Sequence, residues 1–229
     1  MGRLHLPGCV TYVDKNYRTL ARPSSRGIAG HSMGGYGAVA IGMKHTDVFS
    51  AIYAHAPSCL SRSDTNEVKY PSLLWEVVGS YTSREQLSAD FDSNEVLYAN
   101  LFVAMSAAFS PNAGRKPFYA DFPFEERDGK LQLNREVYEQ WKNKTPIYFI
   151  DTYKNNLLSL RGFVFEFGTN EVFPDIRVNT PRFAYALAER AIPHRFEIYE
   201  GGTHESMLKE RLENNILPFF SEILDFSNP

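Results

Sequence analysis

The chain has little of several features that would place it in a narrow class of protein. Its 229 residues include two cysteines, Cys9 and Cys59, too few for a disulfide framework and without the spacing of a zinc site. No apolar run approaches the length of a membrane span, and the few residues before "LPGC" leave no room for a secretory signal. A cytoplasmic protein without a membrane partner is therefore expected.

Strong charge and cofactor motifs are lacking too. The net charge of -3 gives no electrostatic reason to expect nucleic-acid binding. There is no H-E-x-x-H motif, no P-loop and no cluster of ligand residues, so neither a metal nor an organic cofactor is expected. The composition, 43% hydrophobic and 22% charged, is that of a globular protein, and the length predicts one domain over residues 1–229.

What the chain does contain is an alternation of strand and helix patterns. Short apolar segments bounded by glycine or proline predict strands at 26–30, 50–57, 161–168 and 194–202. Helical patterns are present at 9–18, 33–45, 83–91, 93–109, 134–143, 180–191 and 205–224. The alternation at both ends predicts an α/β fold with a mostly parallel sheet flanked by helices.

The middle of the chain, 58–146, differs from the two ends. It is helical, it contains a loop rich in proline and aromatic residues, and no buried strand is evident there. We expect it to be a cap-like insertion on the sheet. Its aromatic residues are candidates for a substrate pocket, although each one is individually more typical of a hydrophobic core: Trp75, Phe118, Tyr119, Phe122 and Phe124.

Residues Gly30-His31-Ser32-Met33-Gly34 match G-x-S-x-G, the nucleophile elbow, in which a serine lies on a sharp turn between a strand and a helix. An apolar strand is predicted before the motif and a helix of small residues after it, as the motif requires. Side chains in place of Gly30 and Gly34 are expected to collide with the neighbouring strand or helix. The serine hydroxyl then projects above the sheet, and the Met33 N–H points to where an oxyanion forms.

The same segment contains a second pattern, the dinucleotide fingerprint G-x-G-x-x-A, at residues 35–40. That motif requires an acidic residue about twenty positions further on, at the end of the next strand. The next predicted strand ends "HAPSC" instead, so the nucleophile elbow is favoured.

A nucleophilic serine needs a histidine base. In hydrolases built on this elbow, the acid and then the histidine follow the serine in the chain. His204 follows the last predicted strand through a Gly-Gly turn and is the expected base. His31 is the variable position of the motif and His55 ends the second strand, where a histidine is more often part of the core. Both are candidate pocket residues.

The acid that orients the base is expected after the strand at 161–168. Glu171 lies closest to the end of that strand and is the first choice, and Asp175 is the second. Asp151 is a third, weaker candidate, because the segment before it does not clearly form a central strand. Each of these carboxylates also fits a solvated loop.

A family resemblance extends over residues 8–224. It rests on the segments "GHSMGGYGAVAIGMKHTDVFSAIYAHAPS", "FGTNE", "ALAERAIPHRFEIYEGGTH" and "LPFFSEIL". These resemble the esterase D-like branch of the α/β hydrolases, which includes S-formylglutathione hydrolases, feruloyl esterases and mycolyl transferases. The resemblance implies that Ser32 is the nucleophile and His204 the base, with Glu171 at the family's G-x-x-D acid. Glutamate in place of aspartate lengthens the reach by one methylene.

The beginning of the sequence departs from this family pattern. In such hydrolases the serine strand is the fifth of about eight, and the loop after the third strand donates a second N–H to the oxyanion. The segment before Ser32 is too short for four strands with their crossovers, so we expect a sheet without the usual N-terminal strands and see no source for the second donor. Three outcomes are open: a truncated but folded enzyme, a sheet whose edge pairs with another subunit, and a fragment with reduced catalytic activity. The open edge favours a homo-oligomer.

The sequence thus predicts a serine carboxylesterase that hydrolyses small-molecule esters, with short-chain acyl or aryl groups, through an acyl-enzyme. One alternative is an acyltransferase with the same triad, in which an acceptor alcohol outcompetes water. Another is a non-catalytic binding protein built on the hydrolase fold.

Overall fold

The structure is a computed structural model that describes residues 6–62, 76–89 and 94–227. The chain forms two compact units. The sheet unit comprises Leu4–Arg62 and Thr145–Pro229, and the inserted unit comprises Ser63–Lys144.

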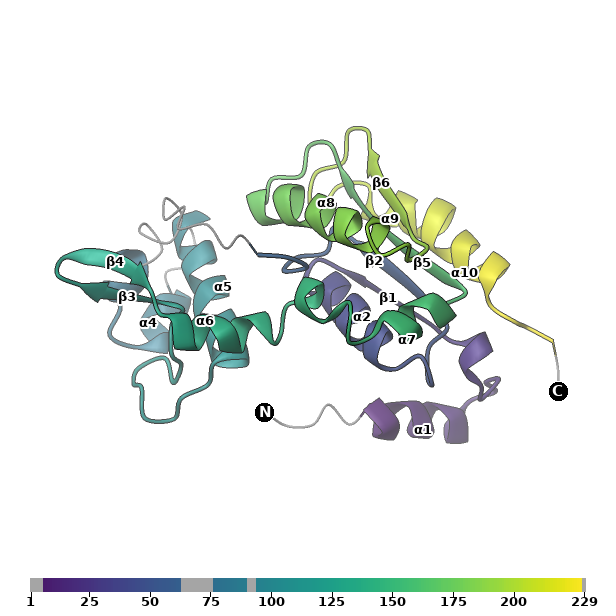
Figure 1. Cartoon of the computed structure of the whole chain (residues 1–229), viewed down its shortest axis with the longest axis horizontal. Helices are drawn as coiled ribbons and strands as arrows, with labels where there is room; N and C mark the ends of the chain where they lie inside the picture. The colour runs from purple at the N-terminus through teal and green to yellow at the C-terminus, as the bar shows by residue number, and fades with distance from the viewer. Residues whose placement is uncertain (1–5, 63–75, 90–93, 228–229) are drawn as a thin grey trace. The chain divides into compact units, whose positions relative to one another are not determined.

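The sheet unit contains a four-stranded sheet in which all neighbouring strands are parallel (Figure 1). In spatial order the strands are β1 (Gly27–His31), β2 (Ala51–His55), β5 (Gly162–Gly168) and β6 (Arg195–Tyr199). Their order in the sheet follows their order in the chain, so each crossover joins direct neighbours. The predicted α/β fold with a mostly parallel sheet is confirmed.

Helices precede, connect and follow these strands. They are α1 (Leu6–Asn16), α2 (Met33–Lys44), α7 (Lys154–Ser159), α8 (Pro174–Ala188), α9 (Leu208–Arg211) and α10 (Leu217–Ile223). A π-helical turn, Leu212–Ile216, joins the last two, so the single closing helix predicted at 205–224 is in fact interrupted. The helix predicted at 180–191 begins earlier, because Pro174 occupies its first turn and Pro181 is accommodated inside it.

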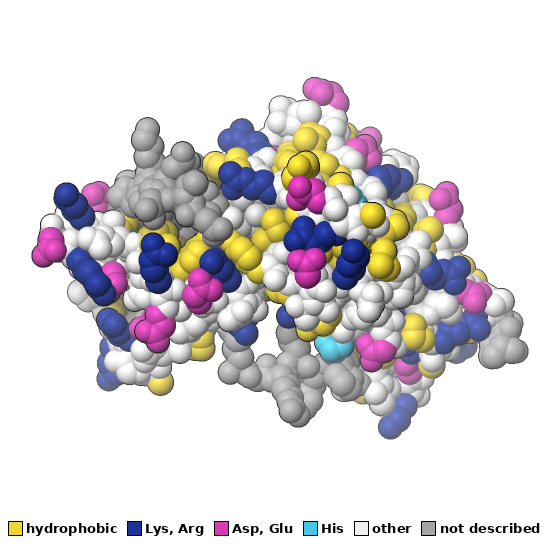
Figure 2. Space-filling model, viewed as in Figure 1, with side chains coloured by type: hydrophobic (Ala, Val, Ile, Leu, Met, Phe, Trp, Pro, Cys, Tyr) yellow, Lys and Arg dark blue, Asp and Glu magenta, His cyan; other side chains and the backbone are white. Residues whose placement is uncertain are grey.

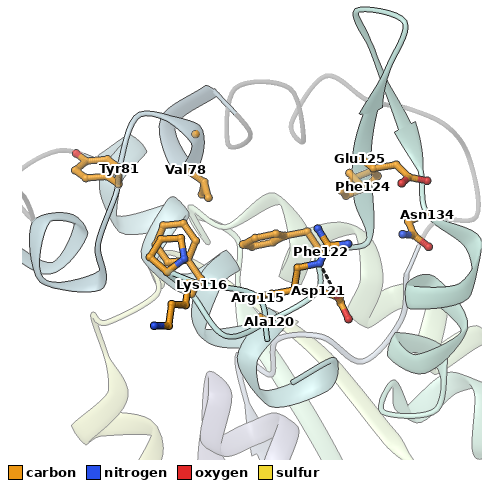
Figure 3. Close-up of a pocket in the computed structure, with 13 residues that line it drawn as sticks. Val78, Tyr81, Arg115, Lys116, Ala120, Asp121, Phe122, Phe124, Glu125 and Asn134 are labelled. Atoms are coloured by element: carbon orange, nitrogen blue, oxygen red, sulfur yellow. Dashed lines mark ion pairs between the residues drawn. The ribbon is translucent and has the colours of Figure 1, made fainter. Parts of the chain in front are cut away.

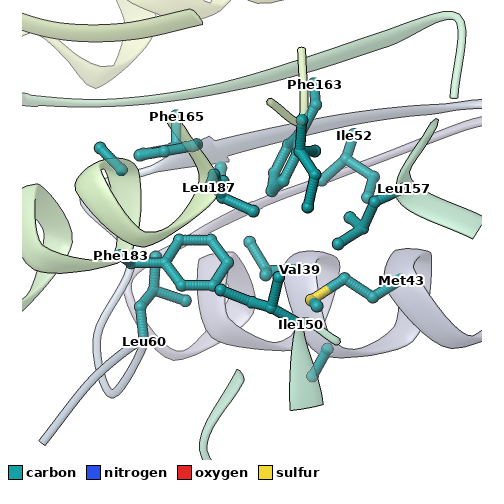
Figure 4. Packing of buried hydrophobic residues seen from close by; sticks show 14 of the residues in the cluster. Val39, Met43, Ile52, Leu60, Ile150, Leu157, Phe163, Phe165, Phe183 and Leu187 are labelled. Carbon is teal, nitrogen blue, oxygen red and sulfur yellow. The ribbon is translucent and has the colours of Figure 1, made fainter. Parts of the chain in front are cut away.

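The main hydrophobic cluster lies on one face of this sheet, and Figure 4 shows its packing. It joins Ile52 of β2 and Phe165 of β5 to Val39 of α2, Leu157 of α7 and Phe183 of α8. These side chains are almost fully buried. Burial of several large apolar side chains, each contributing about 2 kcal/mol, is the main stabilisation that holds α2, α7 and α8 against the sheet.

A second cluster covers the opposite face of the sheet. Successive side chains of a strand point to opposite faces. Tyr53 and Val164 accordingly point away from the first cluster and pack against Ile216 and Phe219 of the C-terminal helical segment. The central strands are therefore buried on both sides, which fixes the position of the loops at their carboxyl ends.

The inserted unit has a helical core and one β-hairpin. Its elements are α4 (Arg84–Ala89), α5 (Asn94–Phe109), β3 (Phe124–Arg127), β4 (Lys130–Leu133) and α6 (Arg135–Lys142). Trp141 is fully buried and donates its indole N–H to the Ser110 hydroxyl over 2.8 Å. The hairpin turn, Asp128-Gly129, has positive φ at both residues, as a tight two-residue turn requires.

The surface carries mixed charge. Figure 2 shows lysine and arginine side chains interspersed with aspartate and glutamate over the viewed face. None of the helices within the described ranges is both long and apolar enough to cross a lipid bilayer.

Candidate active site

Ser32 lies between β1 and α2 in a strained backbone conformation. Its φ of 56° and ψ of -117° place it in a region that residues with a side chain rarely occupy. Two hydrogen bonds hold the turn: the Ser32 N–H donates to the His55 carbonyl over 2.9 Å, and the Tyr36 N–H donates to the Ser32 carbonyl over 3.0 Å. The neighbouring strand and the first turn of the helix thus impose the conformation that exposes the hydroxyl.

The glycines around Ser32 are not equally constrained. A Cβ at Gly30 would overlap the backbone of Gly34, and one at Gly35 would lie 2.9 Å from the Pro57 Cα. A Cβ at Gly34 itself would meet no atom of the described residues within 4 Å. The expectation that a side chain at either motif glycine would collide with its surroundings is therefore wrong for Gly34. The glycine that faces the loop after β2 is Gly35.

His204 approaches Ser32 from the loop after β6. Its Nε2 atom lies 2.9 Å from the Ser32 hydroxyl oxygen, and its side chain is nearly buried. The ring of Phe173 meets the His204 ring edge to face, with centroids 4.5 Å apart. The imidazole is therefore held at hydrogen-bond distance from the serine and shielded from water on one side.

Glu171 lies on the other side of His204. Its Oε2 atom is 2.9 Å from His204 Nδ1, and its Oε1 atom accepts the Phe173 N–H over 2.9 Å. Burial, the largest influence, opposes ionisation of the carboxyl. Hydrogen bonds from His204 and from the N–H groups of Phe173 and Val172 outweigh it and lower the Glu171 pKa below its usual value. The carboxylate is thus ionised at neutral pH although it is buried.

The other candidate acids lie elsewhere. Asp175 accepts the Cys59 N–H over 2.9 Å and the Asn179 side-chain amide over 2.7 Å, so it ties the loop after β2 to α8. Asp151 forms an ion pair with Arg190, with 2.7 Å between carboxylate and guanidinium. Of the three carboxylates considered, the structure brings only Glu171 to His204.

His31 and His55 form a row of imidazole rings with His204. The His31 ring centroid lies 4.7 Å from that of His204 and 5.1 Å from that of His55. His31 Nε2 is 2.8 Å from the His204 carbonyl oxygen, so the His31 ring N–H donates a hydrogen bond to the backbone of His204. The sequence predicts His31 only as a candidate pocket residue, because no pattern in it indicates a hydrogen bond between residues 173 positions apart.

His55 is fully buried, with 1% of its surface exposed. Its Nε2 atom lies 2.9 Å from the Tyr199 hydroxyl, and its Nδ1 atom has no partner among the described residues. Burial lowers the pKa of His55 to about 4, and the neighbouring His31 and Arg211 act in the same direction. His55 is therefore neutral at physiological pH and adds no positive charge beside His204.

A buried ion pair lies on the face of the sheet that packs against the C-terminal helical segment, opposite the main hydrophobic cluster. Glu166 of β5 is fully buried and is paired with Arg211 of α9, and it accepts the Tyr53 hydroxyl over 2.8 Å. The Arg211 guanidinium also stacks over the Tyr199 ring, 4.3 Å from its centroid. These contacts anchor the helix that follows the His204 loop.

The aromatic residues predicted to form a pocket belong to the inserted unit. Phe118, Phe122 and Phe124 line a cavity within that unit (Figure 3). Tyr119 is 42% exposed and is not part of the lining. Trp75 lies outside the described residues.

The site has the arrangement of an α/β hydrolase. A serine lies on a strand-to-helix turn of a parallel sheet, and the loops after the last two strands supply a carboxylate and a histidine. Within that class, the chain belongs to the family described as "Putative esterase", whose model matches residues 9–216. A search of curated protein sequences finds no significant match.

Solved structures share the fold at low sequence identity. A ferulic acid esterase is 20% identical with a TM-score of 0.54, over 94% of this chain and 58% of that protein. An S-formylglutathione hydrolase from Staphylococcus aureus is 13% identical with a TM-score of 0.52, over 93% and 61%. Another, from Agrobacterium tumefaciens, is 16% identical with a TM-score of 0.54, over 96% and 56%. The chain thus spans between 56% and 61% of these proteins.

Proposed function

We propose that the protein is a serine carboxylesterase in which Ser32 is the nucleophile, His204 the general base and Glu171 the orienting acid. The observation that carries the proposal is the unbroken series of contacts from carboxylate to imidazole to hydroxyl, with 2.9 Å at each step. When the neutral imidazole donates its Nδ1–H to Glu171, its Nε2 lone pair faces Ser32.

The chemistry follows from this placement. His204 takes the hydroxyl proton as the Ser32 oxygen attacks the ester carbonyl carbon, and the carbonyl oxygen becomes an oxyanion. His204 then gives the proton to the departing alcohol, which leaves an acyl group on the serine. Water, deprotonated by the same imidazole, attacks the acyl carbon; the bond from that carbon to the Ser32 oxygen breaks, the imidazolium returns the proton to that oxygen, and the carboxylic acid leaves. The substrates in this proposal are small esters with a short-chain acyl or aryl group.

Met33 supplies the donor for the oxyanion. It is the first residue of α2, and the N–H groups of the first helical turn have no acceptor within the helix. The positive end of the helix dipole adds to the stabilisation of the developing negative charge.

Hydrolysis of p-nitrophenyl acetate tests this function. We expect turnover by the wild-type chain and its loss in Ser32→Ala, with full activity in the control Ser159→Ala, which changes a serine whose hydroxyl donates to the Asn156 carbonyl in α7. Equal activity of wild type and Ser32→Ala would contradict the proposal. Product analysis with added alcohols separates hydrolysis, which yields acetic acid, from acyl transfer, which yields a new ester.

A further inference from the structure

The two loops that carry the acid and the base are in direct backbone contact where they leave the sheet. The acid loop, residues 169–171, follows β5, and the base loop, residues 200–204, follows β6. A Cβ at Gly168, the last residue of β5, would lie 2.1 Å from the Gly202 carbonyl oxygen. The two backbones therefore touch because Gly168 has no side chain.

Two backbone hydrogen bonds continue the strand pairing into these loops. The Thr169 N–H donates to the Tyr199 carbonyl over 2.8 Å, and the Asn170 N–H donates to the Gly202 carbonyl over 3.0 Å. Every residue except proline has such an N–H group. These bonds set the register of the loops, but they do not explain why threonine and asparagine occupy the two positions.

The side chains of Thr169 and Asn170 both bind Gly201 of the base loop. The Gly201 N–H donates to the Thr169 hydroxyl oxygen over 2.9 Å, and the Gly201 carbonyl accepts the Asn170 side-chain amide over 3.1 Å. All three residues are exposed, so water could satisfy the same groups, and burial does not require these bonds. The structure therefore indicates a role for them other than the pairing of buried polar groups.

Gly201 is the point of the base loop where such a restraint has a large effect. Its φ of 84° lies in the left-handed region that favours glycine, and a Cβ there would meet no atom of the described residues within 4 Å. Because glycine has more backbone freedom than any other residue, rotation at Gly201 would move the loop that carries His204. Bonds to both backbone groups of Gly201 limit that rotation.

The other side of His204 is held within its own segment. The Thr203 N–H donates to the Ser206 hydroxyl over 2.8 Å, and the Ser206 N–H donates to the Thr203 hydroxyl over 3.2 Å. This reciprocal pair forms a local turn around His204. The residues before His204, in contrast, are held by the acid loop.

We propose that Thr169 and Asn170 are positioning residues of the active site. They hold Gly201 in place, and in this way keep the His204 imidazole in contact with the Glu171 carboxylate. Neither side chain transfers a proton, and both act through the base loop. The inference rests on the proposed function, since it assigns these residues to the triad of that reaction.

Steady-state hydrolysis of p-nitrophenyl acetate by the full chain tests this role. Thr169→Val removes the hydroxyl at nearly constant volume, and we expect kcat to fall by about three- to tenfold with KM nearly unchanged. Thr169→Ser keeps a hydroxyl and should recover most of the loss. The matched control Thr19→Val removes an exposed hydroxyl that donates to Asp14 and should leave both constants unchanged.

Two results of these assays would overturn the proposal. One is equal kcat in Thr169→Val and the wild-type chain. The other is equal loss in Thr169→Val and Thr169→Ser, because the hydroxyl would then have no part in the effect.

A double-mutant cycle tests whether Thr169 acts through the triad. In a Glu171→Gln chain the carboxylate that the imidazole is aligned with is already gone, so Thr169→Val should lower the residual kcat by less than about twofold. The same fold-change in both chains would show that Thr169 acts independently of Glu171, and the proposal would be wrong.

Deuterium uptake by the peptide that covers residues 200–206 tests the restraint without any turnover. Asn170→Ala removes the donor to the Gly201 carbonyl while the Gly201 N–H keeps its acceptor, so faster uptake reports a looser loop. We expect uptake about twofold faster or more in this variant. Uptake should be unchanged in Asn16→Ala, which removes an exposed amide that donates to the Tyr12 carbonyl. Unchanged uptake in Asn170→Ala would overturn the proposal.

The two kinds of measurement separate failure of this inference from failure of the proposed function. A wild-type chain that does not hydrolyse the ester would contradict the esterase proposal and the catalytic role of the two residues, while uptake in Asn170→Ala would still decide whether they order the base loop. An active wild-type chain with unchanged kcat in Thr169→Val would leave the esterase proposal in place and contradict this inference alone.

Discussion

The Nε2 atom of His204 lies 2.9 Å from the hydroxyl oxygen of Ser32, although 172 positions separate the two residues in the chain. β1 and β6 are the two outermost strands of the sheet. Because all strands are parallel, the carboxyl ends of both lie at the same end of the sheet, and the residues that follow them meet there.

The carboxylate partner of His204 can be tested by a matched pair of amide substitutions. Glu171→Gln removes the charge that orients and stabilises the imidazolium, so we expect kcat for ester hydrolysis to fall by about 10²- to 10⁴-fold. Asp175→Asn leaves His204 untouched and should retain most activity. The opposite order of effects, measured by steady-state kinetics, would assign the acid to Asp175.

His31 should act as a positioning residue through its bond to the His204 carbonyl. His31→Phe removes that donor, and we expect kcat to fall about two- to tenfold with KM nearly unchanged, since a hydrogen bond contributes about 0.5–1.5 kcal/mol. His31→Gln retains an N–H donor and should recover part of the loss. If the two variants have the same kcat, the hydrogen bond has no role in catalysis.

Stability should fall on mild acidification because of His55. Its pKa is about 4 in the folded chain and 6.5 as a model group, so the unfolded chain takes up the proton first as the pH falls. Stability is thus fully present above pH 6.5 and is lost as the pH falls toward 4, by on the order of 3 kcal/mol. The pKa of His31 is also lowered, chiefly by burial, and acts in the same direction, whereas the lowered pKa of Glu171 has its effect at more acidic pH.

Urea unfolding at pH 7.5 and pH 5 measures this effect. The difference in unfolding free energy between the two pH values should shrink in His55→Phe. It should stay the same in His45→Gln, whose side chain is 46% exposed. Equal pH dependence of wild type and His55→Phe would rule out the buried neutral imidazole as the cause.

Removing one partner of the buried Glu166–Arg211 ion pair should cost far more folding stability than removing one partner of a surface pair. Arg211→Ala leaves Glu166 buried without its charged partner, and we expect a loss of about 3–5 kcal/mol in thermal or chemical unfolding. Lys209→Ala removes an exposed pair with Glu213 at 3.8 Å and should cost less than about 1 kcal/mol. Similar losses in both variants would show that the burial of Glu166 has no energetic consequence.

The sequence predicts the elements of the sheet unit well because each carries a local pattern. The strand that ends at His31, the elbow at Ser32 and the loop position of His204 all follow from glycine placement and apolar periodicity. The hairpin at Asp128-Gly129 was missed because its strands are short and exposed, although a D-G turn between two extended segments is a recognised hairpin signal.

Long-range contacts were beyond the reach of the sequence. The choice between Glu171 and Asp175 depends on which carboxylate faces the imidazole, and both lie within a few residues of the same strand end. The donor role of His31 and the burial of His55 arise where loops and strands distant in the chain meet. Spacing along the sequence does not encode such distances.

Intact-mass spectrometry after treatment with a fluorophosphonate, with the modified peptide located by digestion, tests the central assignment most directly. The account predicts a single adduct on Ser32 in the wild-type chain and no adduct in Ser32→Ala. An unmodified wild-type chain, or an adduct on another residue, would contradict it.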